Sequence, residues 1–418
     1  MSAKTILVLH RIPFANIQYD RVVDHQHFNV IYIGSEQALC DIPDYVSCEK
    51  WSVNLNENWL DIVVNRVLRS GLQIERILGM SEYQLESAAK LRERLGVSGA
   101  TLAQVQLSRD KVLMKEAVAA AQLRVPFFCS LVKAMQQDIP ELVNLRVVLK
   151  PKKGASSEDI QVFESMDELL NRVAEKRTHI SAIDQDELYA DFEVEEFVVG
   201  EIWHIDGFTK QGVVEHSVAS QYVGNCLAFA QGHAFGSVQM PMPATLATFS
   251  QAVVSAVEIE NGSFHLEVFK QGDQWVFLEI GHRCGGADVV QSFLLKTGVN
   301  LYHAHISTQL DLQDTFNIQE KNDYFGWFVF PGHHLTGGYA QIIDSNDYQN
   351  HPFVVRWNQL PKSIPLTKQI TYQKTQVPVA GVFCCPTSEQ GIDFLSSLFT
   401  SIVVNSYTPT EELVYETV

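Results

Sequence analysis

Two runs of alternating residues between Ser263 and Ile280 constrain the fold more than any other part of this sequence. The first run reads Ser-Phe-His-Leu-Glu-Val-Phe-Lys and the second reads Trp-Val-Phe-Leu-Glu-Ile, with Gly272 and Asp273 between them. Alternation of apolar and polar residues on both sides of a Gly-Asp pair is typical of a β-hairpin with one buried face. The segment therefore predicts two antiparallel strands that belong to a larger sheet.

The apolar residues of this hairpin predict its register. We expect six of them to share the buried face: Phe264, Leu266, Val268, Val276, Leu278 and Ile280. Residues of equal parity must then pair, because a shift by one residue turns a whole strand over. A three-residue loop, Gly272-Asp273-Gln274, meets this requirement and sets Glu267 directly across from Glu279. The alternative is a two-residue Gly-Asp turn, which would set Glu267 across from Leu278 and leave both glutamates solvated.

Two directly opposed carboxylates repel each other unless a cation lies between them. Opposed Cβ atoms are about 4.5–5.5 Å apart, which is close enough for strong repulsion. Glutamate oxygens on rigid strands suit Mg²⁺, which takes one or two carboxylates and completes its shell with water and nucleotide phosphates. Glu267 and Glu279 therefore predict a site for a metal and a nucleotide. Arg283 follows the second strand and offers a planar cation for an anionic intermediate, or an ordinary ion pair.

A loop rich in lysine joins two further expected strands, Arg146–Lys150 and Ile160–Phe163. It contains Gly154, Ser156 and Ser157 after the sequence Lys-Pro-Lys-Lys. Backbone N–H groups, hydroxyls and ammonium groups in such a loop can align along a polyphosphate. The loop does not match the P-loop pattern G-x-x-x-x-G-K-[ST], so P-loop ATPase chemistry is disfavoured. The other interpretation is an exposed polar hairpin of ordinary composition.

Charge and cysteine content exclude several classes of partner. The 418 residues include 49 Asp and Glu against 31 Lys and Arg, which gives a formal net charge of −18. This surplus repels nucleic-acid phosphates and anionic lipid, so we expect neither a nucleic acid nor a membrane as partner. Seven cysteines without a C-x-x-C pair fit a reducing compartment, and no apolar run approaches the ~20 residues that span a bilayer. We expect a soluble, cytoplasmic protein that binds small molecules.

The length and the order of the expected elements predict three units. Residues 1–98 alternate strand and helix signals and predict a small parallel α/β unit. Residues 99–320 predict an α+β unit with antiparallel hairpins, in which Ser108 caps a helix. Residues 321–418 contain further strand signals and predict a β-rich C-terminal unit. The expected fold class is therefore mixed, with α/β and α+β parts.

Five motifs in a fixed order make this chain resemble the ATP-grasp enzymes. They are Ser108-Arg-Asp-Lys111, Val148-Leu-Lys150-Pro with Gly154-Ala-Ser-Ser157, the run from Val194 to Gly207, Glu267 in His-Leu-Glu, and Glu279-Ile-Gly-His-Arg283. The appended C-terminal unit and the run Arg283-Cys-Gly-Gly286 are most similar to bacterial L-amino-acid ligases, which join two amino acids into a dipeptide. The resemblance implies the ATP-grasp architecture, with a lid subdomain at about residues 125–200.

The resemblance also implies a role for each matching residue. Lys111 and Lys150 would contact nucleotide phosphates, and Gly154, Ser156 and Ser157 would belong to a loop that closes over them. The remaining implied roles are a hinge whose backbone reads adenine (Glu196, Phe197, Val198), ribose contacts (Glu201 or His204), ligands of Mg²⁺ or Mn²⁺ (Glu267, Glu279) and a cation that steadies the acyl phosphate (Arg283). Many relatives have Glu-x-Asn-x-Arg at the last motif, whereas Gly281 replaces the asparagine here, which leaves a second metal position open.

The expected activity is the ATP-dependent ligation of two L-amino acids through an aminoacyl phosphate. Arginine is a candidate substrate because of the acidic surplus, and the resemblance implies a homodimer. His233 and His282 are the candidates for the base that takes the proton of the amine. The alternatives are an ATP-grasp ligase or carboxylase with another acceptor, a small-molecule kinase, and a non-catalytic nucleotide or amino-acid sensor.

Overall fold

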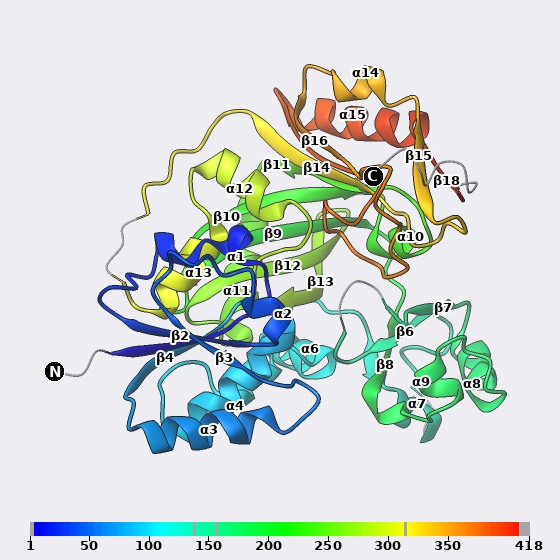
Figure 1. Ribbon diagram of the computed structural model, residues 1–418. Helices are drawn as coiled ribbons and strands as arrows, with labels where there is room; N and C mark the ends of the chain where they lie inside the picture. The colour runs from blue at the N-terminus through cyan, green and yellow to red at the C-terminus, as the bar shows by residue number, and fades with distance from the viewer. Residues whose placement is uncertain (1–3, 137–138, 155–157, 313–315, 409–418) are drawn as a thin grey trace.

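The computed structural model describes residues 4–136, 139–154, 158–312 and 316–408. It confirms the predicted mixture of α/β and α+β structure. A parallel sheet lies at the N-terminus, and a large antiparallel sheet forms the centre. A smaller antiparallel sheet projects to one side of the centre (Figure 1).

The N-terminal sheet has four parallel strands in the order β3-β2-β1-β4. The strands and helices of this region are β1 (Thr5–Leu9), α1 (Phe14–Ile17), β2 (Asn29–Gly34), α2 (Glu36–Leu39), β3 (Glu49–Ser52), α3 (Trp59–Ser70), β4 (Ile74–Gly79) and α4 (Leu85–Leu95). Apolar residues of α3 and α4 cover one face of the sheet. The other face packs on α1 and on α13 (Leu301–Gln309) of the central unit. Both faces are thus buried, as is usual for a parallel sheet.

The projecting sheet is antiparallel, with the strand order β5-β8-β6-β7. Its elements are β5 (Phe128–Ser130), α7 (Leu131–Gln136), β6 (Val147–Pro151), β7 (Gln161–Phe163), α8 (Met166–Ala174), α9 (Ser181–Asp184) and β8 (Phe192–Glu196). Leu149, Phe163 and Val194 on the strands pack with Leu131, Leu169 and Ile183 on the helices in a core of their own. We call residues 128–196 the lid subdomain, and the range of about 125–200 given for it from the sequence stays a prediction.

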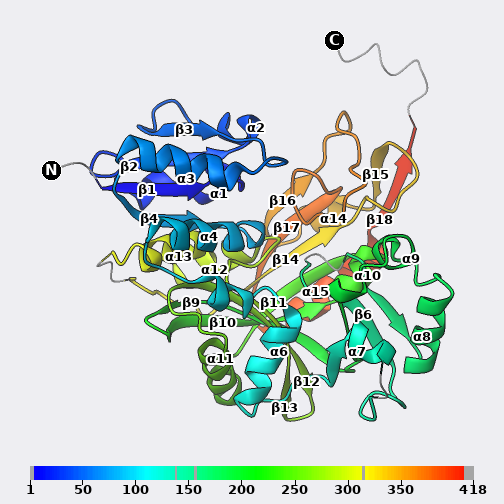
Figure 2. The same ribbon diagram turned by 90° about the horizontal axis from the view of Figure 1, so that it is seen from below.

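The central sheet has eight antiparallel strands in the order β13-β12-β9-β10-β11-β14-β17-β16. Its first part comprises α5 (Leu102–Gln106), α6 (Lys111–Ala120), β9 (Glu201–Lys210), β10 (Val213–Val223), α10 (Cys226–Ala230), β11 (Phe235–Met240), α11 (Ala244–Ala256), β12 (Gly262–Gln271), β13 (Gln274–Gly281), α12 (Val289–Thr297), α13 and β14 (Tyr324–Phe330). Helices α6 and α11 cover one face of β9, β12 and β13. Helices α12 and α13 cover the other face (Figure 2).

Three C-terminal strands complete this sheet, and two others, β15 and β18, form a small antiparallel sheet of their own. Strand β14 pairs with β11 on one side and with β17 (Val379–Cys385) on the other. The other C-terminal elements are β15 (Tyr339–Ile343), α14 (Asn346–Gln349), β16 (Val354–Gln359), α15 (Ser388–Ser401) and β18 (Val403–Tyr407). Helix α15 packs its apolar face on β11, β14 and β17. The domain boundaries at residues 98 and 320 stay predictions, although the sheet crosses the second one.

Helix α6 begins at Lys111, and its N-cap lies two residues after the predicted one. The prediction that Ser108 caps this helix is wrong, because the Ser108 hydroxyl donates a hydrogen bond to the carbonyl of Val105. The cap is Asp110, whose Oδ1 accepts hydrogen bonds from the N–H groups of Val112 (3.0 Å) and Leu113 (3.3 Å). A carboxylate at this position also opposes the positive end of the helix dipole. Asp110 thereby fixes the first turn, which carries Lys111.

Among the described residues, no helix combines the length and the apolar character needed to cross a membrane.

We predict that Asp110→Ala loosens the start of α6. Loss of an N-cap side chain costs about 1 kcal/mol, so first-turn amides of α6 should exchange with solvent about fivefold faster. Hydrogen exchange measured by mass spectrometry on a peptide covering residues 108–120 would check this. Asp110→Asn keeps an oxygen acceptor and serves as the control, and equal exchange in the two variants would contradict the assignment.

Candidate active site

The hairpin of β12 and β13 sets Glu267 directly across from Glu279, as predicted. The predicted three-residue loop is wrong, because Gln271 pairs with Gln274 and the turn has two residues, Gly272 and Asp273. A β-bulge between Glu267 and Val268 leaves Leu278 as an extra residue on β13 and restores the register. The two glutamates therefore face each other even though the turn is the shorter one.

The bulge also changes which residues reach the core. Phe264, Leu266, Val268 and Ile280 are buried there as expected. Trp275 and Phe277 replace the predicted Val276 and Leu278 on that face. Leu278 instead joins Phe269, Glu267 and Glu279 in the wall of a cavity between the lid subdomain and the central sheet. The apolar pattern therefore predicted the glutamate pairing correctly, but it predicted the wrong buried residues on the second strand.

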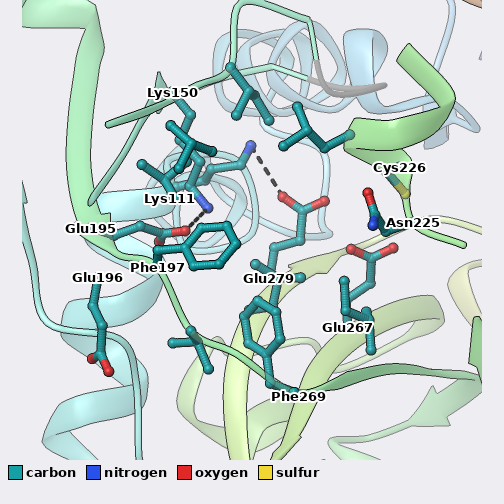
Figure 3. A pocket seen from close by; sticks show the side chains of 18 of the residues that line it. Lys111, Lys150, Glu195, Glu196, Phe197, Asn225, Cys226, Glu267, Phe269 and Glu279 are labelled. Atoms are coloured by element: carbon teal, nitrogen blue, oxygen red, sulfur yellow. Dashed lines mark ion pairs between the residues drawn. The ribbon is translucent and has the colours of Figure 1, made fainter. Parts of the chain in front are cut away.

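This first cavity, which we call the lysine cavity, has a volume of about 310 Å³. Lys111 comes from α6, Lys150 from β6, and Glu267 and Glu279 from the hairpin, so three elements meet there (Figure 3). Its apolar wall contains side chains from both sides of the cavity: Val148, Val162, Val198, Ile202, Phe269 and Leu278. A slot with apolar walls and a few convergent charges is the usual form of a small-molecule site.

Lys111 connects the hairpin with the lysine-rich loop. Its Nζ lies 3.3 Å from Oε2 of Glu279 and donates to the carbonyl of Gly154 at 3.3 Å. Burial raises the pKa of Glu279, but the charges of Lys111, Lys150 and Arg283 outweigh it and lower that pKa to about 2. Glu279 is therefore ionised throughout the physiological range. Gly154 lines the cavity, whereas the predicted Ser156 and Ser157 lie outside the described residues.

Lys150 lies in a buried charge cluster that the sequence prediction did not include. Its Nζ is 2.5 Å from Oε1 of Glu195 and 3.9 Å from Oε1 of Glu193. Lys115 of α6 lies 2.5 Å from Glu193 and 2.7 Å from Glu195. Burial lowers the pKa of Lys150, but the two glutamates raise it above its ordinary value, so its charge is secure. Glu193 and Glu195 alternate on β8, and this alternation was a signal that could have revealed the cluster.

The predicted hinge lines the lysine cavity where β8 ends. Glu196, Phe197 and Val198 all belong to its wall. The carboxylate of Glu196 binds Arg124 at 2.7 Å and accepts from the N–H of Phe127, so it is turned away from the cavity (Figure 3). The backbone N–H groups of Glu196 and Phe197 donate to the carbonyls of Phe127 and Arg146, and the adenine-reading role of the hinge stays a prediction. The Arg146 guanidinium lies over the Phe197 ring at 4.4 Å.

Glu201 and His204 do not lie at the lysine cavity. Glu201 is exposed and accepts a hydrogen bond from the indole of Trp203. His204 is buried, with its Nδ1 2.6 Å from Asp206 and its Nε2 2.6 Å from the Ser237 hydroxyl. Both ring nitrogens are engaged, so the structure gives the predicted ribose contact no support.

Arg283 lines a second cavity of about 350 Å³, which we call the arginine cavity. Its Nε donates to Oε2 of Glu82 at 2.8 Å, and its Nη1 donates to the carbonyl of Cys284. Glu82 belongs to the N-terminal unit and also pairs with Arg109. The sequence gave no local signal for Glu82, because 201 residues separate it from Arg283. A Cβ at Gly281 would lie 3.3 Å from Cγ of Arg283, so the missing side chain leaves room for this arginine.

The two cavities share four wall residues: Tyr222, Cys226, Glu267 and Glu279. The Tyr222 hydroxyl donates to Oε1 of Glu267 at 2.6 Å and fixes that carboxylate at the junction. The amide of Asn225 lies beside Glu267 (Figure 3), at a position that no motif indicated. The facing carboxylates offer oxygen atoms only, which is the donor type that a divalent cation such as Mg²⁺ prefers.

A buried histidine lies behind Glu267. Nε2 of His265 is 3.3 Å from Oε1 of Glu267, and its Nδ1 is 2.7 Å from Asp206. Burial lowers the pKa of His265, but Asp206 and Glu267 raise it to about 10. The base candidates lie elsewhere: His233 is exposed, and His282 donates to the carbonyl of Asn261 with its pKa lowered to about 4 by burial. The structure therefore brings neither His233 nor His282 to the junction of the cavities.

Comparisons with known proteins agree with this fold. Residues 143–291 match the ATP-grasp domain family, and no curated protein sequence matches the chain. The structure is similar to the L-amino acid ligase from Bacillus licheniformis, with a TM-score of 0.71, 16% identity, and 97% of this chain and 99% of that chain covered. The match places an ATP-grasp domain at residues 143–291, and the structural similarity shows a fold shared over nearly the whole chain, in line with the resemblance that the sequence motifs carry.

Two other neighbours have the same fold at low identity. Phosphoribosylglycinamide synthetase from Anaerococcus prevotii has a TM-score of 0.62 and 14% identity, with 97% of this chain and 100% of that chain covered. The N5-carboxyaminoimidazole synthetase from Staphylococcus aureus complexed with ADP has a TM-score of 0.63 and 13% identity, covering 96% and 97%. The shared fold therefore extends over nearly the whole chain. The names of these neighbours indicate different reactions.

We predict that Lys111→Met moves acid unfolding to higher pH. The folded-state pKa of Glu279 lies below its ordinary value of 4.5, so its stabilising effect is complete above that value and is lost as the pH falls toward 2. Removing Lys111 raises the folded-state pKa of Glu279 toward 4.5 and reduces this stabilisation, so less acid should be needed to unfold the variant. Acid titration followed by tryptophan fluorescence would measure the midpoint. Lys133→Met, at an exposed lid position, is the control, and equal midpoints for the two variants would contradict the pairing.

Proposed function

We propose that this protein is an ATP-dependent ligase that joins two L-amino acids into a dipeptide and releases ADP and phosphate. The observation that carries the proposal is the common wall of the two cavities. Glu267 and Glu279 stand where the lysine cavity meets the arginine cavity. A phosphoryl group from the first cavity and a carboxylate from the second would meet there.

The lysine cavity suits ATP. Lys111 and Lys150 supply two ammonium groups whose charges are held by buried carboxylates. The apolar residues around the hinge suit the faces of a purine ring, and the strand end after Glu196 offers backbone groups for its edge. Glu267 and Glu279 would hold Mg²⁺, or Mn²⁺ in its place, which when bound neutralises charge on the phosphate oxygens.

The residues of the junction would then guide two displacements. A carboxylate oxygen of the first amino acid attacks the γ-phosphorus, the bond to the ADP oxygen breaks, and an acyl phosphate forms. The amine of the second amino acid attacks the acyl carbon after losing a proton, and inorganic phosphate leaves. Arg283 donates from Nε to Glu82 and from Nη1 to the carbonyl of Cys284, and its other N–H groups remain to steady the negative oxygens.

The arginine cavity favours an amino acid over a phosphorylated acceptor. Among the described residues of its wall, the cationic side chains are Arg283 and His265, and no lysine is present. Both cations already contact carboxylates. A ribonucleotide phosphate, as the names of some neighbours suggest for those proteins, would lack the free cations that usually bind it. The homodimer and the cytoplasmic location expected from the sequence remain predictions.

We predict that Glu279→Gln abolishes amino-acid-dependent ADP release. Losing one carboxylate of the facing pair should lower the rate at least roughly 100-fold, the scale seen when one group that stabilises transition-state charge is removed. ADP and phosphate release with pairs of amino acids, together with the mass of the product, would measure it. Glu215→Gln removes the same charge at an exposed position of β10 and should keep full activity. Normal turnover by Glu279→Gln would refute the proposed site.

Lys150→Ala should weaken ATP binding by about 10- to 100-fold, because hydrogen bonds to charged groups contribute about 1.5–3 kcal/mol. Lys115 remains beside Glu195 in this variant and keeps the buried carboxylate paired. Isothermal titration calorimetry with ATP would give the affinity, and Lys133→Ala in the lid subdomain is the matched control. An unchanged affinity would exclude a phosphate contact for Lys150. Tight ATP binding by the unaltered protein without turnover on any pair of amino acids would instead favour a sensor.

A further inference from the structure

Aromatic and aliphatic side chains form a large part of the wall of the arginine cavity. Besides the charged residues at the junction, it contains Tyr222, Phe235, Val289, Tyr302, Trp327 and Tyr372. Trp327 and Tyr372 come from residues 321–418, on β14 and on the segment between β16 and β17. A volume of about 350 Å³ is within the range of small-ligand pockets. The cavity is therefore suited to enclose an apolar group next to the reacting carboxylate.

The aromatic residues hold each other in place. The ring centroids of Tyr222 and Phe235 are 4.7 Å apart, and those of Phe235 and Trp327 are 5.3 Å apart. Tyr372 stacks on Phe229 with centroids 4.7 Å apart. Contacts of this kind stabilise the arrangement beyond simple burial. The wall is thus formed in advance, and a ligand need not order it.

The carboxylates of this cavity already have partners, which disfavours a cationic side chain. Glu82 pairs with Arg283 and Arg109, Glu279 with Lys111, and Glu267 with Tyr222 and His265. A lysine or arginine substrate would bring a second positive charge in addition to its α-ammonium group. Burying an unpaired charge costs several kcal/mol. An apolar side chain gains about 0.8 kcal/mol for each buried CH₂ group, so the apolar ligand is favoured.

From this balance we infer that the arginine cavity selects an amino acid with an uncharged, apolar side chain, and that Gly286 and Tyr372 set its size limit. The inference rests on the proposed function, because it assigns the substrate of the same site. It differs from the arginine substrate suggested by the net charge, because the carboxylates in the cavity wall are already paired with cations of the protein.

Gly286 and Tyr372 are neighbours in the wall of the cavity. A Cβ built at Gly286 would meet only Cδ2 of the Tyr372 ring, at 4.0 Å. The φ angle of Gly286 lies outside the left-handed region, so other residues are tolerated there. A side chain at position 286 would therefore fill the cavity without straining the backbone, whereas a smaller residue at position 372 would enlarge it.

Direct binding separates this inference from the proposed ligase activity. We expect leucine, methionine or phenylalanine to bind at least roughly tenfold more tightly than arginine or glutamate, measured by calorimetry with a non-hydrolysable ATP analogue and Mg²⁺. Arginine binding as tightly as leucine, or no binding by any amino acid, would overturn the inference. Apolar amino acids that bind without supporting ADP release would leave the inference intact and contradict the ligase.

Two variants test the size limit from opposite directions. Gly286→Val should weaken phenylalanine and leucine binding at least about tenfold and leave alanine nearly unchanged, since it fills space that only larger side chains use. Tyr372→Ala should shift the preference toward phenylalanine and tryptophan, and Tyr372→Phe keeps the ring and serves as its control. Unchanged ATP affinity would show that each variant is folded. An equal loss for alanine and phenylalanine in Gly286→Val would overturn the assignment of the size limit.

Discussion

The rest of the site depends on one constraint, the pairing of Glu267 directly across from Glu279 on the two strands of the hairpin. A two-residue turn with uniform pairing would have set Glu267 across from Leu278. The bulge between Glu267 and Val268 shifts the register by one residue and returns Glu279 to the opposed position. Bulges occur often beside active sites because they redirect side chains. One extra residue on β13 thus places both carboxylates in the wall that separates the two cavities.

Buried cations make this concentration of acidic groups tolerable, and they also join the units of the protein. Lys115 on α6 binds two glutamates of the lid subdomain. Lys111 on the same helix binds Glu279 on the hairpin, and Arg283 binds Glu82 of the N-terminal unit. Each pair links elements that are distant in the sequence. Breaking such a pair leaves a buried charge without compensation, so the charge arrangement and the relative placement of these elements depend on each other.

The sequence predicted the parts of this site that have a local signature. Alternating apolar residues gave the hairpin and the facing glutamates, and the lysine-rich loop gave Lys150. The turn length and the bulge were not predicted. The shorter turn shifts the pairing by one residue and the bulge shifts it back, so the glutamate pairing is the same as with a three-residue loop. Glu82 and Tyr222 were missed, since their roles arise only when distant segments meet. The ribose contact expected for His204 has no support for a related reason. Asp206 and Ser237 occupy both of its ring nitrogens, and Ser237 lies on another strand, so the sequence around His204 did not reveal this contact.

The C-terminal strands have a consequence for how such a protein can diversify. Residues 321–418 supply Trp327, Tyr372 and Gln373 to the arginine cavity, while the described wall of the lysine cavity ends at Glu279 in the sequence. If the proposed function holds, the last quarter of the chain contributes to recognition of the side chain and not to the described wall of the nucleotide cavity. Exchange of these residues would then alter selectivity without touching the described nucleotide contacts.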